Sequence, residues 1–201
     1  MFYRIIPRSL FFLFLIFVFL LYSCQKENNV NPANQKPRVG SKWVFRYSTF
    51  YPTGGLISSG NVTFQATGME TLGGEQWLKI VDTATGTAVF YLKEKTDGIY
   101  QYINNNSYLF CKYPAVINDT YQGYAISEAA DYFVRNVGQT MAFGVLGDLT
   151  LNHYEGIAGG VTVDQLWFNT RVWLAQRYIY TKPLMGNYYR SASLIIQNFI
   201  Y

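Results

Sequence analysis

Short runs in which aromatic and polar residues alternate make up much of the sequence between Pro37 and Tyr201. The first run, residues 42–48, carries Trp43, Phe45 and Tyr47 at every second position. Because successive side chains of a β-strand point to opposite faces, a period of two places all three rings on one face. An α-helix would scatter them around its circumference, so the run predicts a strand with one buried face.

Turn-forming glycine, asparagine and proline residues separate these runs at short intervals, as in antiparallel β structure. Beyond residues 42–48, we expect strands at 61–66, 76–81, 87–93, 99–103, 108–113, 149–154, 161–168, 171–180 and 188–199. About ten evenly spaced strands predict an all-β domain, built as an antiparallel barrel, half-barrel or sandwich. Residues 127–135 fit two alternatives, a short helix capped by Ser127 or a strand through residues 132–134.

The N-terminus has the layout of a secretory signal peptide. Arg4 and Arg8 supply positive charge, and Leu10–Tyr22 is an uninterrupted run of 13 apolar residues. As a helix this run is roughly 20 Å long, which is short of the ~30 Å needed to cross the hydrocarbon core of a bilayer. We therefore expect the segment to be removed rather than to stay as a membrane anchor.

Leu21-Tyr22-Ser23-Cys24 ends the apolar run and resembles the lipobox of bacterial lipoproteins. The resemblance implies cleavage after Ser23, attachment of diacylglycerol to Cys24 and acylation of its freed amine by a fatty acid such as palmitate. Since each buried methylene contributes about 0.8 kcal/mol, two or three long chains hold a protein on a bilayer. The partner implied at this end is a membrane. The alternative is an ordinary cleaved signal peptide with an incidental cysteine.

The residues after the cysteine, Gln25-Lys26-Glu27-Asn28-Asn29, resemble the signal that exports some Gram-negative lipoproteins to the cell surface. Position 25 is not Asp, which favours the outer membrane over the inner one. A solvated tether is the alternative, because residues 25–37 are rich in Asn and contain no aromatic residue. We thus expect a signal peptide at 1–23, a lipidated cysteine and flexible tether at 24–36, and a single β-rich domain at 37–201.

The charge pattern argues against one class of partner. Cleavage before Cys24 removes two of the 16 basic residues and none of the 12 acidic residues, so the formal net charge falls from +4 to +2. The remaining Lys and Arg residues are scattered singly through the aromatic runs and form no basic cluster. This distribution excludes nucleic acid as a partner.

The domain also carries three short motifs: Gly40-Ser41-Lys42-Trp43, then Tyr91-Leu92-Lys93 followed by Gly98-Ile99-Tyr100, and Lys112-Tyr113-Pro114. Together they resemble a group of uncharacterised β-rich envelope lipoproteins of Gram-negative bacteria. The resemblance covers half of the domain and does not extend to residues 183–186. It implies an antiparallel β domain and no particular activity.

Side chains that carry catalytic or metal chemistry are few. His153 is the only histidine, which excludes a two-histidine metal site. Cys111 is the only cysteine besides Cys24, and its apolar neighbours favour a buried residue over a nucleophile paired with His153. No phosphate-binding loop or nucleophile elbow is present. We expect no enzymatic activity, no cofactor and no metal, and we keep a hydrolase as the distant alternative.

Two functions fit such a domain. The first is contact with other envelope proteins, through which a non-catalytic lipoprotein would act. The second is binding of a glycan or an apolar ligand, for which the aromatic candidates are Trp43, Trp77, Trp167 and Trp173. Aromatic side chains are equally the usual filling of a β core, so an exposed tryptophan pair or a large closed cavity would favour ligand binding.

We expect Cys24→Ser to abolish lipid attachment and to release the protein from the membrane fraction, because the thioether forms on the cysteine sulfur. Metabolic labelling with a fatty-acid analogue, followed by membrane fractionation, measures both effects. Cys111→Ala is the matched control and should keep the label. A labelled Cys24→Ser protein would contradict the assignment.

Overall fold

The computed structural model describes residues 36–124, 131–142, 148–183 and 185–201. Residues 36–201 belong to one compact unit. The predicted signal peptide, Cys24 and the tether up to residue 35 lie outside the described residues, so these parts stay predictions.

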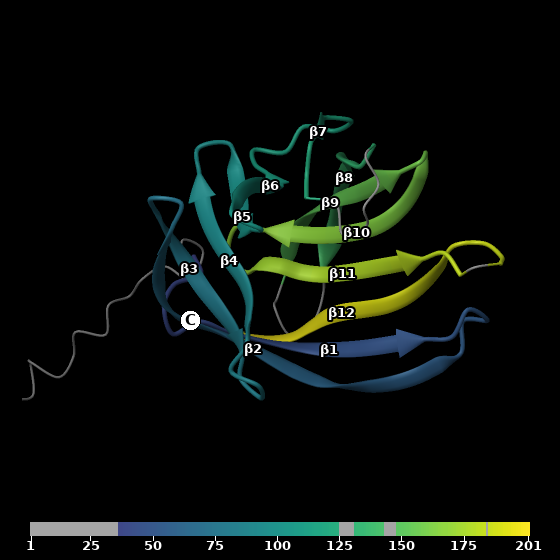
Figure 1. Ribbon diagram of the computed structural model, residues 1–201, viewed down its shortest axis with the longest axis horizontal. Coiled ribbons are helices and arrows are strands. Elements are labelled where there is room, and N and C mark those ends of the chain that lie inside the picture. Colours follow the sequence, from purple (N-terminus) through teal and green to yellow (C-terminus); the bar gives the residue numbers. More distant parts are fainter. Residues whose placement is uncertain (1–35, 125–130, 143–147, 184) are drawn as a thin grey trace, which may run out of the picture. The chain divides into compact units, whose positions relative to one another are not determined.

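Within the described residues, twelve antiparallel strands form a single sheet (Figure 1). They are β1 (Lys42–Phe50), β2 (Leu56–Leu72), β3 (Glu75–Asp82), β4 (Ala88–Lys95), β5 (Gly98–Ile103), β6 (Asn106–Lys112), β7 (Thr120–Tyr121), β8 (Phe133–Ala142), β9 (Leu149–Ala158), β10 (Val161–Asn169), β11 (Trp173–Thr181) and β12 (Tyr189–Ile200). Their order in the sheet is β6-β5-β4-β3-β2-β1-β12-β11-β10-β9-β8-β7. Neighbours in the sheet are therefore neighbours along the chain, except that the first strand pairs with the last.

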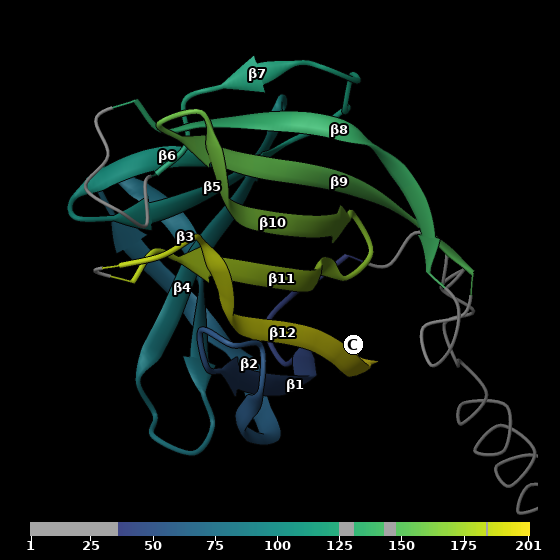
Figure 2. The same cartoon turned by 90° about the vertical axis from the view of Figure 1, so that its right-hand side faces the viewer.

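The sheet curves into a nearly closed barrel, which brings the edge strands β6 and β7 towards each other (Figure 2). This confirms the predicted all-β antiparallel barrel. The strand count is higher than expected because β7 and β8 come from the irregular middle of the sequence, where a bulge between Asn136 and Gly138 breaks the alternation. The short helix considered for 127–135 is wrong from Phe133 onward, since β8 begins there, while residues 125–130 lie outside the described residues.

Side chains rather than a ladder of backbone hydrogen bonds join β6 to the other edge of the sheet. The Tyr121 hydroxyl donates to the Phe110 carbonyl oxygen at 3.0 Å, and the Tyr154 hydroxyl donates to the carbonyl oxygen of Lys112. The Lys112 ammonium also pairs with the Asp119 carboxylate at 2.5 Å. Because an open edge strand invites pairing with another chain, these bonds protect a weak point of the sheet.

Aromatic rings fill the barrel interior. Phe45, Phe64, Phe90 and Phe110 form a continuous row in which neighbouring ring centroids are 5.5, 6.2 and 6.2 Å apart. Two cavities remain beside this row, an apolar one of about 20 Å³ and a polar one of about 30 Å³. Each has room for only one or two water molecules, so the interior is packed rather than hollow.

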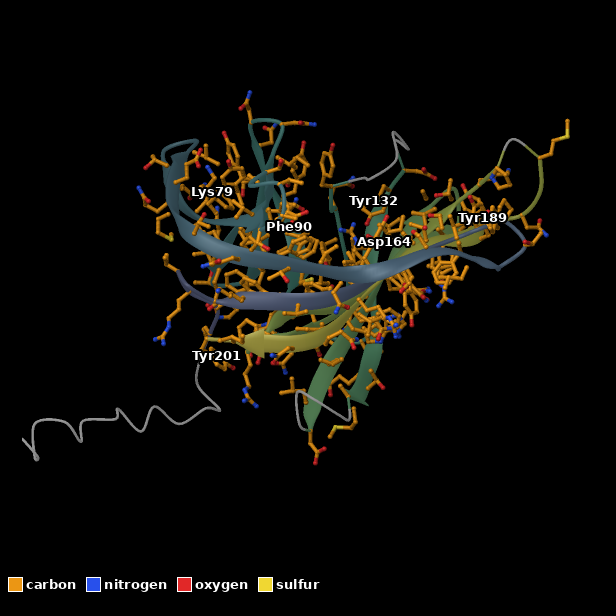
Figure 3. All side chains as sticks on the ribbon, turned by 90° about the horizontal axis from the view of Figure 1, so that it is seen from below. Lys79, Phe90, Tyr132, Asp164, Tyr189 and Tyr201 are labelled. Carbon is orange, nitrogen blue, oxygen red and sulfur yellow. The ribbon has the colours of Figure 1, made fainter. Side chains whose placement is uncertain are left out.

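An ion pair inside the barrel borders the polar cavity. The Arg177 guanidinium donates two hydrogen bonds to the Asp164 carboxylate, at 3.1 and 2.8 Å, and Tyr132 lies near the pair (Figure 3). The Arg177 and Asp164 side chains are 12% and 2% exposed. Burial lowers the pKa of Arg177, but the Asp164 carboxylate raises it by more, so the guanidinium stays charged. Each charge depends on its partner because little water reaches either one.

We expect Arg177→Met to lower the free energy of unfolding by about 3–5 kcal/mol, because it leaves the Asp164 carboxylate buried without a partner. Urea denaturation at neutral pH measures the change. Arg135→Met is the matched control: Arg135 pairs with Glu155 at 2.9 Å, but its side chain is 41% exposed. The expected loss there is under about 1 kcal/mol. Equal losses of unfolding free energy in the two variants would show that burial does not increase the contribution of the Arg177–Asp164 pair to stability.

Candidate functional site

The four tryptophans expected as ligand contacts occupy two kinds of position. Trp43, Trp77 and Trp173 are buried, whereas Trp167 is partly exposed. Trp43 and Trp173 come together at the apolar cavity, where the Trp43 indole N–H donates to the Val172 carbonyl oxygen at 2.6 Å. Trp77 and Trp167 lie on β3 and β10, which are not neighbours in the sheet. Three of the four therefore serve as packing, and the four do not form one site.

Trp167 belongs to a ladder of side chains that runs from β9 to β1. Its ring stacks on His153 at 4.2 Å with the planes 7° apart, and it meets Tyr178 edge-on at 5.1 Å. The Arg190 guanidinium lies 4.8 Å from the Tyr178 ring centroid and 4.6 Å from that of Phe50. Because His153 covers one face of the indole, a sugar could stack there only by displacing the imidazole. The ladder is therefore a set of cross-strand contacts that stabilises the sheet.

The two candidates for nucleophilic chemistry have different surroundings. Cys111 is 0% exposed in the core, and burial raises the pKa of its thiol. His153 stacks on Trp167, and burial lowers its pKa below the ordinary 6.5 against a smaller opposing effect of the Glu155 carboxylate. A protonated core thiol and a neutral imidazole stacked on a partly exposed indole do not make an activated nucleophile and base.

A cleft opens where β4 and β5 stop pairing. Their ladder ends at Leu92 and Gln101, so in the described part of the chain no strand pairs with the β5-facing side of residues 88–91. The cleft has a volume of about 520 Å³, which lies in the range of small-molecule sites. It is lined by residues 88–91 of β4, by residues 101–105 of β5 and the turn after it, and by Leu72.

Aromatic rings and amide groups give this cleft its chemistry, and none of its lining residues is charged. The Tyr102 ring is supported by Trp77, whose centroid lies 5.3 Å away and whose indole N–H donates to the Leu72 carbonyl oxygen at 2.9 Å. Gly73, at a φ of +58°, leaves room for Tyr102, because a Cβ there would lie 3.0 Å from the Cε2 atom of its ring. Tyr102 is thus held in place before any ligand arrives.

Sequence reasoning missed the cleft, although it placed strands at 87–93 and 99–103. The sequence contains the turn residues Asn104 and Asn105 and the tyrosines of both strands. The cleft itself forms where two neighbouring strands separate, and no local residue pattern marks that point. A bulge between β3 and β4, where Ile80 pairs with Phe90 and Val81 with Ala88, lies beside that point.

No protein-family model and no curated protein matches this chain. A solved structure from Bacteroides fragilis, of a protein inferred to be exported and described as having a YmcC-like fold, is similar over 83% of this chain and 98% of its own. The sequence identity is 8% and the TM-score is 0.44.

Among the described residues, the structure contains no apolar helix of the length that a membrane crossing requires. The same residues contain no group of three or more His, Cys, Asp or Glu placed to hold a metal ion.

We expect His153 to titrate below its ordinary pKa of 6.5, because burial against Trp167 penalises the charged imidazolium. His153 is the only histidine, so in tag-free protein its C2–H proton gives a single NMR signal that reports the titration. Glu155→Gln removes the charge that opposes the shift, so its midpoint should fall further. A midpoint at or above 6.5 in the unmodified protein would contradict the expected environment.

Proposed function

We propose that this protein is a non-catalytic lipoprotein of the outer membrane that binds a ligand in the cleft between β4 and β5. The observation that carries the proposal is a contrast in volume. The cleft measures about 520 Å³, whereas the two interior cavities measure about 20 and 30 Å³ and a hollow beside the β4–β5 turn about 240 Å³. Among these four, only the cleft reaches the ~300–1,000 Å³ that small-molecule sites occupy.

The described domain begins at Lys36, away from the cleft, so a lipid anchor at Cys24 would be joined to it outside the binding site. At ~3.5 Å or less per residue, the segment from Cys24 to Lys36 reaches about 40 Å, so the lipid would keep the domain close to the bilayer. Lys36 pairs with Glu94 at 2.6 Å, which places the entry of the tether beside the last residues of β4. The cleft begins at the opposite end of that strand, at Ala88, so the tether enters away from it.

A non-catalytic role is supported by the side chains that line the cleft. Its polar side chains are tyrosine hydroxyls and amides, and no carboxylate, imidazole or thiol, the groups most often used as general bases or nucleophiles, lines it. The candidates with more reactive chemistry, His153 and Cys111, do not line it. We therefore expect a ligand to leave the cleft unchanged.

Contact with another envelope protein is the second candidate function. Val116 and Ile117 are adjacent in the loop between β6 and β7, and each is 62% exposed. Neighbouring exposed aliphatic side chains are a common feature of protein contact surfaces. Such a contact would use a different part of the domain from the cleft.

Thermal shift of the full-length protein in detergent tests the binding function. The panel contains neutral oligosaccharides, anionic polysaccharides, hexapeptides and phospholipids. A ligand at 100 times its Kd should stabilise the protein by about 2.7 kcal/mol and raise its Tm. Mass spectrometry of the ligand after incubation should show it unaltered.

Ala88→Trp fills the cleft and should remove the shift, whereas Val161→Trp changes an exposed residue on β10 and should leave it intact. No shift with any class, or a shift that Ala88→Trp does not reduce, would contradict the proposal. Conversion of the ligand would contradict its non-catalytic part.

A further inference from the structure

We infer that the ligand of the β4–β5 cleft is a neutral carbohydrate, an inference that rests on the proposed function. The observation behind it is that tyrosine rings, amide side chains and the ends of an interrupted sheet ladder meet in one cleft without a charged lining residue.

The uncharged lining selects against charged ligands. Moving a carboxylate, phosphate or ammonium group from water into contact with this surface would cost hydration, and no opposite charge lines the cleft to compensate. One charged group lies beside the lining: the Lys79 ammonium is 5.9 Å from the centroid of the Tyr91 ring, and the Glu70 carboxylate neutralises it at 2.9 Å. The cleft is therefore suited to a neutral molecule.

The lining also selects against purely apolar ligands. Tyr91 and Tyr102 bring hydroxyl groups, and Asn105 brings an amide that both donates and accepts hydrogen bonds, as does Gln101, which also lines the interior polar cavity. An acyl chain would cover these groups without bonding to them, which costs free energy. Nor can such a chain continue into the barrel, because the apolar cavity that shares Phe90 with the cleft has a volume of only about 20 Å³.

A sugar satisfies both parts of this surface. The C–H bonds on one face of a pyranose ring pack on an aromatic ring, and the hydroxyl groups around its edge match amides and unpaired backbone groups, since each hydroxyl donates and accepts. Tyr102 offers a ring already fixed by Trp77 and by the turn at Gly73, so little conformational entropy is lost when it binds.

An extended peptide is the main competitor, because the free side of β4 could accept a further strand. That free side is short, covering residues 88–91, and it contains the bulge between Phe90 and Ala88. Short and bulged edges are features by which sheets avoid strand addition. The free stretch of β5, residues 102–103, is shorter still. The backbone geometry therefore favours a sugar over a strand.

Biolayer interferometry with the full-length protein in detergent tests the inference. The immobilised ligands are neutral oligosaccharides derived from cellulose, xylan, mannan and starch, the anionic polymers polygalacturonate and heparin, and a hexapeptide library. We expect binding to at least one neutral glycan. Tyr102→Ala should weaken it at least tenfold, whereas Tyr102→Phe, which keeps the ring, should stay within about threefold.

A second variant distinguishes a loss of binding from a folding defect. Asn105→Gly removes the amide but keeps a residue that tolerates the φ of 61°, and it should weaken glycan binding at least threefold. Asn118→Gly is the matched control, because Asn118 is also exposed, has a φ of 66° and lies outside the cleft. It should bind as the unmodified protein does.

The outcomes separate the ligand class from the site. Binding to peptides or anionic polymers alone, lost in Tyr102→Ala and Asn105→Gly, overturns the carbohydrate inference and leaves the cleft as the binding site. Glycan binding that survives both variants overturns the cleft, and with it the proposed function. Binding to none of the ligands overturns the carbohydrate inference, and the proposed function falls with it only if the phospholipids of the thermal-shift panel also fail to bind.

Discussion

Tyrosine hydroxyl groups join the two edges of the sheet. A sheet that closes through backbone ladders alone would have no edge, but here β6 has a backbone ladder only with β5, and on its other side Tyr121 and Tyr154 donate to the carbonyl oxygens of Phe110 and Lys112. Burial raises the pKa of both tyrosines, so each keeps the proton that it donates. Between the two acceptors, Cys111 has no exposed surface. The interior behind this seam is therefore shielded from water.

Among the described residues, this interior holds a paired charge and two small cavities of about 20 and 30 Å³. There the Arg177 guanidinium donates two hydrogen bonds to the Asp164 carboxylate, so each buried charge has a partner of opposite sign. The aromatic row reaches this ion pair, since Phe110 also lines the polar cavity, and beside the row an apolar cavity of about 20 Å³ remains. A small β-barrel has space either for side chains or for a ligand, and this one is filled with side chains. The proposed ligand binding would therefore take place where the wall is interrupted or on its outer surface.

Alternation of aromatic and polar residues was enough to predict the all-β class and most of the strands, because the period of two follows from strand geometry alone. It was not enough to assign the inner and outer faces. Trp167 follows Leu166 and precedes Phe168, two core residues, so it faces outward, whereas Trp43 faces inward in a run of similar composition. Which face is inner depends on register with strands far away in sequence, and the Trp43 strand pairs with β12. The β4–β5 cleft depends in the same way on where two strands part.

Trp77, one of the four tryptophans predicted to contact a ligand, acts on the cleft only through a neighbouring residue. It is 1% exposed and so cannot present its ring to a ligand. Its indole N–H is fixed by the Leu72 carbonyl oxygen, and its ring supports Tyr102, which does line the cleft. The aromatic residue that would contact a ligand is therefore a tyrosine whose orientation the tryptophan determines. Lys93 and Lys95 lie 6.0 and 5.5 Å from the centroid of the Trp77 ring, and both pair with the Glu75 carboxylate, so positive charge covers the Trp77 ring where Tyr102 does not.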